Sequence, residues 1–87
     1  MILNKAISYP IRYTMSYTTE LIDFVKSRRD QLGLTQQELA ERAGVGLRFV
    51  RDLEQGKESL RLDKVNQVLA MFGHKMGPIK IEERDEL

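Results

Sequence analysis

The chain contains no cysteine and only one histidine among its 87 residues. The absence of cysteine excludes disulfide frameworks and cysteine-based metal sites, and it favours a reducing, cytoplasmic location. The apolar runs are too short to cross a bilayer, and the N-terminal residues lack the pattern of a secretory signal. We therefore expect one small cytoplasmic domain that has no membrane partner.

Residues that could carry catalysis or hold a metal are equally scarce. No carboxylate cluster with metal-ligand spacing surrounds the single histidine, His74, so a surface or strand-terminal position is expected for it. The glycines do not follow a strand, so they do not form a phosphate-cradling loop. The sequence predicts no enzyme activity, no catalytic residue, no metal and no cofactor.

The charge balance becomes informative only when it is divided along the chain. The 14 basic and 13 acidic side chains give a net charge of +1. Residues 82–87 hold four acids and one base, so the remainder of the chain carries +4. Local charge governs contacts with phosphate more than total charge does, so the composition permits nucleic-acid binding.

The most informative stretch is residues 33–56, which reads as two short helices joined by a glycine turn. Thr35 followed by Glu38 is the pattern of a capping box, in which each side chain bonds the other residue's backbone N–H. The first helix should cover residues 36–43, and Gly44 supplies the left-handed residue that ends it.

The second helix of the pair should run from residue 47 to 54 or 55 and end before Gly56. Gly46 stands at its N-cap, where Ser, Thr or Asn would cap better. Val50 and Leu53 share an inward face. The opposite side carries Leu47, Arg48 and Arg51.

Two further helices should complete the domain. The first, capped by Thr18 or Thr19 and ended by Gly33, has a predicted buried stripe of Leu21, Ile22, Val25 and Leu32. The other begins near residue 62 and ends at Gly73, with Leu62, Val65, Val68, Leu69 and Phe72 as its core face. The predicted fold is all-α, a small bundle of four to five helices.

The ends of the chain differ from this helical domain, which should cover residues 18–73. Residues 1–17 form an arm with weak strand-like alternation, either a packing or flexible segment or a DNA-contacting one. Residues 74–81 should be extended, and such a strand needs a partner from the arm or from a second copy of the chain. Residues 82–87 form a charged tail, expected to be disordered.

A helix-turn-helix of this kind places its second helix in the major groove of DNA. Arg48 can read a guanine edge with two hydrogen bonds, and Leu47 either contacts a thymine methyl or packs at the helix start. Arg51 either follows Arg48 onto DNA or pairs with Glu54 or Glu58. Gln36 lies at the positive end of its helix, which favours phosphate. Other cations that could approach phosphates are Lys57, Arg61, Arg28 and Arg29.

The residues TQQELAERAGV, followed by the second helix and EQGK, resemble the Cro/C1 (XRE) helix-turn-helix family. The longer stretch GLRFVRDLEQGK, with LRLDKV and a closing strand, is similar to HipB-type antitoxins, which pair with HipA-type kinase toxins. The resemblance covers residues 18–81 and implies a lambda-repressor-like domain that dimerises through C-terminal strands. It also implies binding to a palindromic operator in the protein's own promoter, with the toxin as co-repressor.

By position, the resemblance places Gln36 and Gln37 against phosphates and base edges. It places Gly46, Leu47 and Arg48 deepest in the groove, with Arg51 one turn further on. Gly46 departs from the family, which has a polar residue at this cap. The predicted DNA-contacting set is Thr35, Gln36, Gln37, Gly46, Leu47, Arg48, Arg51, Lys57 and Arg61. The predicted dimerisation residues are Met76, Ile79 and Ile81.

Together these features predict a dimeric, sequence-specific repressor that serves as the antitoxin of a HipA-like kinase toxin in a type II toxin–antitoxin system. One alternative keeps DNA binding without a toxin, as in phage-type or restriction-modification controllers. Another is a protein-interaction adaptor that uses the helix-turn-helix as a scaffold, which the exposed arginines disfavour.

Overall fold

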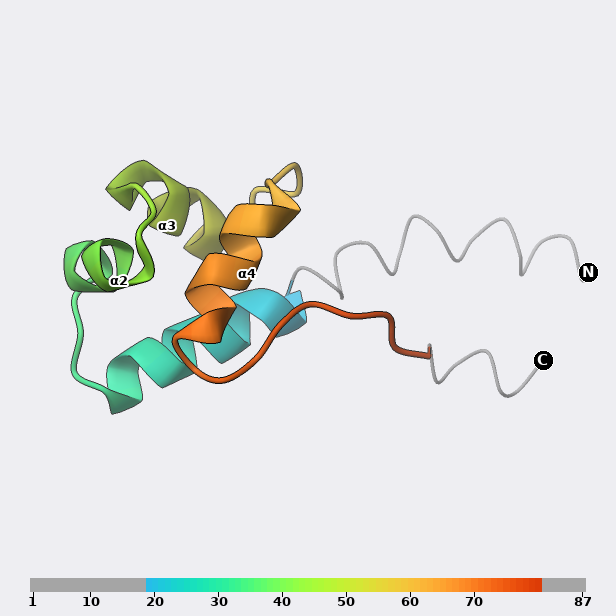
Figure 1. Ribbon diagram of the computed structural model, residues 1–87, viewed down its shortest axis with the longest axis horizontal. Helices are drawn as coiled ribbons and strands as arrows, with labels where there is room; N and C mark the ends of the chain where they lie inside the picture. Colours follow the sequence, from blue (N-terminus) through green and yellow to red (C-terminus); the bar gives the residue numbers. More distant parts are fainter. Residues whose placement is uncertain (1–18, 81–87) are drawn as a thin grey trace, which may run out of the picture.

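The computed structural model describes residues 19–80, and within this range the chain is all-α, as predicted. The N-terminal helix is described over 19–31, with Thr19 already helical, so its beginning lies outside the described range. Three helices follow: α2 (Gln36–Ala43), α3 (Leu47–Glu54) and α4 (Leu62–Ala70). Helix α2 packs against both α3 and α4, and the N-terminal helix runs beneath them (Figure 1).

The capping box predicted for α2 is formed. The Thr35 hydroxyl accepts from the Glu38 N–H at 3.1 Å, and the Glu38 carboxylate accepts from the Thr35 N–H at 2.8 Å. Gly44 ends the helix with φ +77°, and its N–H donates to the Ala40 carbonyl. These bonds satisfy backbone groups that a helix end leaves unpaired, which explains why α2 begins and ends where the sequence predicted.

The bounds predicted for α3 and the start predicted for α4 are also confirmed, but α4 ends at Ala70, and residues 71–73 form a turn where the sequence predicted helix up to Gly73. Gly46 precedes α3 in an extended conformation and provides no side-chain cap, as its missing side chain implies. Gly56, with φ +91°, turns the chain away after α3. A Cβ there would lie 3.3 Å from Cδ1 of Ile22, so the N-terminal helix also passes close to this turn.

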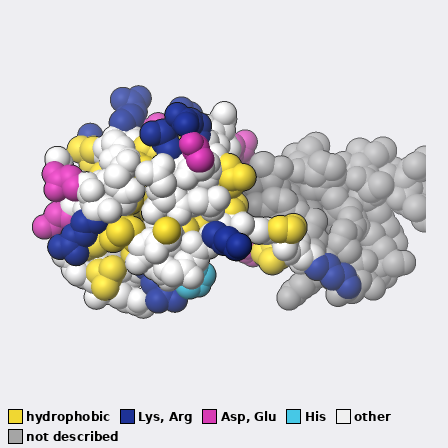
Figure 2. All heavy atoms as spheres, in the orientation of Figure 1, with side chains coloured by type: hydrophobic (Ala, Val, Ile, Leu, Met, Phe, Trp, Pro, Cys, Tyr) yellow, Lys and Arg dark blue, Asp and Glu magenta, His cyan; other side chains and the backbone are white. Residues whose placement is uncertain are grey.

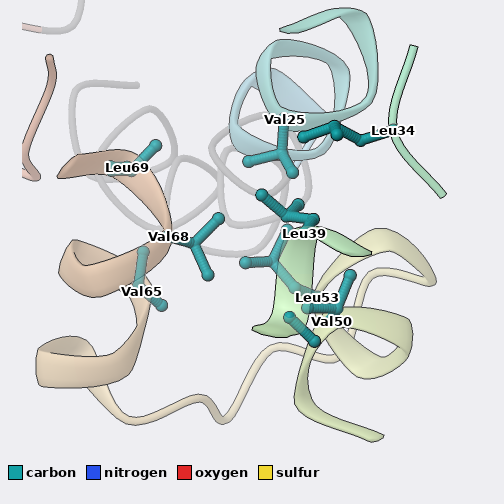
Figure 3. Close-up of a cluster of buried hydrophobic side chains, with 9 residues drawn as sticks. Val25, Leu34, Leu39, Val50, Leu53, Val65, Val68 and Leu69 are labelled. Atoms are coloured by element: carbon teal, nitrogen blue, oxygen red, sulfur yellow. The ribbon is translucent and has the colours of Figure 1, made fainter. Parts of the chain in front are cut away.

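The core lies where the four helices meet, and Figure 3 shows its side chains pointing toward one another from every helix. The buried apolar residues are Val25, Leu34, Leu39, Ala40, Val50, Leu53, Val65, Val68 and Leu69. Two predicted core residues are wrong: Leu32 is 56% exposed and Leu62 58% exposed. Leu32 follows the last helical residue, so the helical period no longer applies. Leu62 is the first residue of α4. A helical side chain leans back over the turn that precedes its own Cα, and for Leu62 that preceding segment is a loop, so its side chain stays exposed.

After α4 the chain continues in an extended conformation over residues 74–80, and the described range contains no strand. The Met76 N–H donates to the Asn66 side chain at 2.8 Å. A strand needs a second backbone to pair with, so the predicted strand does not form in the single chain; its pairing with a second copy stays a prediction. The arm over 1–17, Thr18, Ile81 and the tail over 82–87 lie outside the described residues.

Within the described range, no helix is long and apolar enough to cross a membrane.

Candidate DNA interface

The turn between α2 and α3 is held from below by α4. The side-chain amide of Gln67 donates to the carbonyls of Ala43 and Gly44, both at 3.3 Å. Val45, half-buried, packs against the core cluster. These contacts fix the angle between the two helices, so α3 is presented on a rigid support.

The outer face of α3 carries the predicted reading residues. The Arg48 side chain is 88% exposed, and Arg51 is also exposed, whereas Leu47 is half-buried. Basic side chains gather along the edge of the molecule where α3 lies (Figure 2). Leu47 is therefore less accessible than expected, and its two predicted roles, packing and base contact, both remain open.

A carboxylate that the sequence analysis did not single out lies beside these arginines. Asp52 is 3.4 Å from Nε of Arg48 and 3.7 Å from Nζ of Lys57. The spacing of Arg48 and Asp52, four residues apart on one helix, could have revealed the first pair. Ion pairs this exposed contribute about 0.2–1 kcal/mol, so phosphates can replace Asp52 as the partner of both cations.

The start of α2 lies on the same unit. Thr35 is the N-cap, and its hydroxyl oxygen already accepts a hydrogen bond from the helix. Gln37 is exposed, and its amide donates to Glu41 at 3.3 Å. Gln36 is half-buried, and its amide nitrogen donates to the Glu54 carboxylate at 3.0 Å. The helix-turn-helix thus brings the predicted residues of α2 and α3 into one compact unit.

Arg61, beyond α3, already has an acidic partner. Its guanidinium bonds Asp63 through two contacts, of 2.7 and 3.2 Å, on the exposed surface. The hydrogen bond from Arg61 lowers the pKa of Asp63. The predicted phosphate contact of Arg61 therefore requires this pair to open.

A buried ion pair joins the N-terminal helix to the end of α3. Nε and Nη2 of Arg29 donate to the two carboxylate oxygens of Glu54 at 2.8 and 2.9 Å, and Nη1 donates to the Leu34 carbonyl at 3.0 Å. The Glu54 side chain is 2% exposed and that of Arg29 17%. Arg29 thus has a structural role in the interior that the sequence analysis did not foresee, and its phosphate contact stays a prediction.

The Arg29–Glu54 pair also bears on the prediction that Arg51 pairs with Glu54 or Glu58. Because Glu54 is bound by Arg29 and Gln36, it is not the partner of Arg51. Within the described residues Arg51 forms no ion pair with Glu58 either. Its side chain is therefore available to a ligand on the outer face of α3.

Two opposed effects set the ionisation of Glu54. Burial alone raises the pKa of this carboxyl, but hydrogen bonds from Arg29 and Gln36 and the positive charge of Arg29 outweigh burial, so the pKa is lowered overall. The pKa of Arg29 is raised, chiefly by its hydrogen bond to Glu54. Both groups are charged at neutral pH. No buried side-chain nitrogen or oxygen in the described range lacks a hydrogen-bond partner.

A groove on another side of the molecule contains two of the predicted dimerisation residues. Met76 is 43% exposed and Ile79 76% exposed, and both line an apolar groove of about 620 Å³. The other lining residues are Glu20, Leu21, Phe24, Leu69, His74, Lys75, Gly77 and Pro78. His74 lies against the Phe24 ring, with ring centroids 4.6 Å apart. Among the described residues, no group of histidines or carboxylates could hold a metal ion.

Comparison with known proteins identifies the family of this chain. The family described as helix-turn-helix matches residues 25–75, more than half of the chain. The chain belongs to the helix-turn-helix family. The match confirms the Cro/C1-type resemblance seen in the sequence, while the closer likeness to HipB-type antitoxins stays a prediction. The match thus places the chain in a family of helix-turn-helix regulators and not in a family of enzymes, as the sequence predicted.

One curated relative supports the same assignment. An uncharacterized HTH-type transcriptional regulator of Sinorhizobium fredii, y4mF, is 51% identical over 49 residues. The aligned stretch covers 56% of this chain and 64% of the relative, so the chain spans less than two thirds of that protein. No solved structure matches the chain.

Proposed function

We propose that this helix-turn-helix protein is a sequence-specific DNA-binding transcriptional repressor. The observation that carries the proposal is the outer face of α3, where Arg48 and Arg51 are exposed on a helix whose inner face is locked into the core. The start of α2, with Gln36 and Gln37, belongs to the same unit. Family membership supports this use of the two helices.

In this proposal Arg48 supplies sequence reading. A guanidinium can bond O6 and N7 of guanine together, which discriminates against a wrong base by about 1–3 kcal/mol. The exposure of Arg48 allows it to reach a base edge, and the weak bond to Asp52 restricts where it points. Lys57 and the N-terminus of α2 would bind phosphates, which position the protein on DNA.

We further propose that the repressor is a homodimer. The groove lined by Met76 and Ile79 exposes apolar surface beside residues 74–80, which the structure describes as extended and outside any sheet. Pairing of residues 76–81 with a second copy would satisfy that backbone and cover the groove. Two-fold symmetry then requires an inverted-repeat operator with half-site centres about 34–36 Å apart.

The more specific proposal is that this repressor is a HipB-like antitoxin that regulates its own promoter and binds a HipA-like kinase toxin. Its support is the sequence resemblance described above, over residues 18–81. A kinase-like gene beside the gene for this chain would favour the antitoxin, and its absence would favour a phage-type or restriction-modification controller.

The decisive experiment is binding to DNA from directly upstream of the gene, compared with scrambled DNA across a salt series. Arg48→Ala should weaken binding to the upstream DNA by about 1–3 kcal/mol and relax preference at one base position. Arg42→Ala is the matched control: it removes one positive charge from the exposed last turn of α2. This control variant should weaken binding to both DNAs to the same small extent.

Equal binding of the wild type to both DNAs would overturn sequence-specific repression and favour the adaptor function. If Arg48→Ala weakens binding to both DNAs equally, Arg48 contacts phosphate and does not read a base. Deletion of residues 76–87 should weaken the dimer and with it operator affinity. An unchanged sedimentation profile after this deletion would refute dimerisation through the C-terminal segment.

A further inference from the structure

Glu54 connects the buried interior to the predicted DNA face through Gln36. Its carboxylate oxygen Oε1 accepts from Nη2 of Arg29 and from the amide nitrogen of Gln36, while Oε2 accepts from Nε of Arg29. Gln36 is the first residue of α2, and its side chain is the only one of the predicted DNA-contacting set that bonds a buried group in the described structure. The two residues are 18 positions apart, so the contact depends on the packing of α2 against α3.

This contact determines which way the Gln36 amide faces. An ionised carboxylate can only accept hydrogen bonds, so the NH₂ group of Gln36, and not its oxygen, must point at Glu54. One N–H of that group is then used, and the amide oxygen and the second N–H are left for a ligand. A glutamine without such an anchor rotates among several orientations, and binding would have to select one of them at an entropic cost.

Arg29 makes this arrangement compatible with DNA. A lone carboxylate beneath the start of α2 would repel phosphates and cancel part of the positive potential of the helix N-terminus. Arg29 contacts both oxygens and neutralises the charge where it arises. Glu54 can therefore orient the glutamine without weakening the attraction of this surface for a phosphate backbone.

We propose that Glu54 is a positioning residue for DNA binding, which fixes the Gln36 amide in its binding orientation while Arg29 neutralises its charge. This inference rests on the proposed function, since it requires that the surface binds DNA. It gives the buried ion pair a role in recognition besides its role in folding. Glu54 itself, with a side chain 2% exposed, does not touch the ligand.

The test is a double-mutant cycle on binding affinity with Glu54→Gln and Gln36→Ala. The probe is a duplex selected from a random-sequence library by the wild-type protein, with a scrambled duplex beside it. Glu54→Gln keeps the side-chain volume but replaces one of the two acceptor oxygens with a donor. It should weaken binding to the selected duplex by about tenfold, the size of one charge-assisted hydrogen bond. In the Gln36→Ala background the same change should weaken binding by less than about twofold.

The cycle separates positioning from a purely structural role. A general distortion of α3 would weaken binding equally in both backgrounds, and that result would overturn the proposal. Glu58→Gln is the matched control, because Glu58 is exposed and lies four residues further on, so it removes the same charge without touching Gln36. Affinities are compared at a temperature at which circular dichroism shows every variant to be folded.

If Glu54→Gln does not fold, the side-chain amide of Gln36 in the wild type gives the second measurement by NMR. An anchored amide should exchange its protons more slowly than that of Gln55, which is exposed. Equal exchange for the two glutamines would overturn the proposal. If the wild type selects no duplex from the library, the proposed function fails, and the NMR comparison still reports on the anchoring of Gln36.

Discussion

Replacing Glu54 with leucine should cost the fold about 3 kcal/mol, because it leaves the Arg29 guanidinium buried without its counter-ion. Removal of one member of a buried pair costs about 3–5 kcal/mol. Arg29 keeps 17% exposure and its bond to the Leu34 carbonyl, which favours the lower end of that range. Leucine occupies a similar volume, so loss of packing adds little. The total free energy of unfolding of such a domain is about 5–15 kcal/mol, so the variant remains folded.

Urea unfolding at pH 7, followed by circular dichroism, measures this loss. The double variant Arg29→Met with Glu54→Leu should recover most of it, because an apolar pair of similar volume replaces both charges. Arg61→Met with Asp63→Leu is the matched control, since that pair is exposed and should be worth less than about 1 kcal/mol. A cost below about 1 kcal/mol for Glu54→Leu, or no recovery in the double variant, would refute the reasoning.

The same pair predicts how stability depends on pH. The pKa of Glu54 is lowered in the folded protein from its ordinary value of 4.5, so the unfolded chain binds its proton more readily. The stabilisation is therefore complete above pH 4.5 and is lost as the pH falls through the folded-state pKa. The difference in stability between wild type and Glu54→Leu should shrink in this acidic window. A difference that stays constant there would mean that the carboxylate charge is not what stabilises the fold.

Two further predictions concern the turn and the DNA face. Gly44→Ala should destabilise the fold by about 1–2 kcal/mol, because φ +77° strains any residue with a Cβ, whereas Ser27→Ala, at an exposed position of the N-terminal helix, should have little effect in the same thermal melts. Equal melting temperatures for the two variants would contradict this account of the turn. Asp52→Asn should strengthen binding to any DNA, since Lys57 loses a competing anion, and the salt dependence should steepen by about one unit. Unchanged salt dependence would show that Lys57 does not meet phosphate.

The helix-turn-helix could be predicted closely from sequence because local chemistry determines it. The Thr35–Glu38 capping box and the left-handed Gly44 depend on residues three or four apart, and such patterns are visible in a sequence. The errors at Leu32 and Leu62 arose at helix ends, where periodicity no longer says which way a side chain points.

The buried Arg29–Glu54 pair was missed because its members are 25 positions apart and charged residues are usually exposed. One signal was present: Glu54 follows Val50 and Leu53 on the inward face of α3, and a carboxylate at that position needs a buried cation. The sequence does not identify which cation, since Arg28 and Arg29 are equally near, and only the packing of the helices decides between them.

The two ends of α3 are secured very differently. Its last turn is tied to the N-terminal helix through Glu54, while Gly46 leaves its first turn without a side-chain cap. Amide hydrogen exchange should therefore be slow near residue 53 and fast near residue 48, where the first turn can fray without unfolding the domain. The end of α3 that carries Arg48 is thus the adaptable one, and a phosphate or base at its unpaired N–H groups would supply the cap that glycine does not.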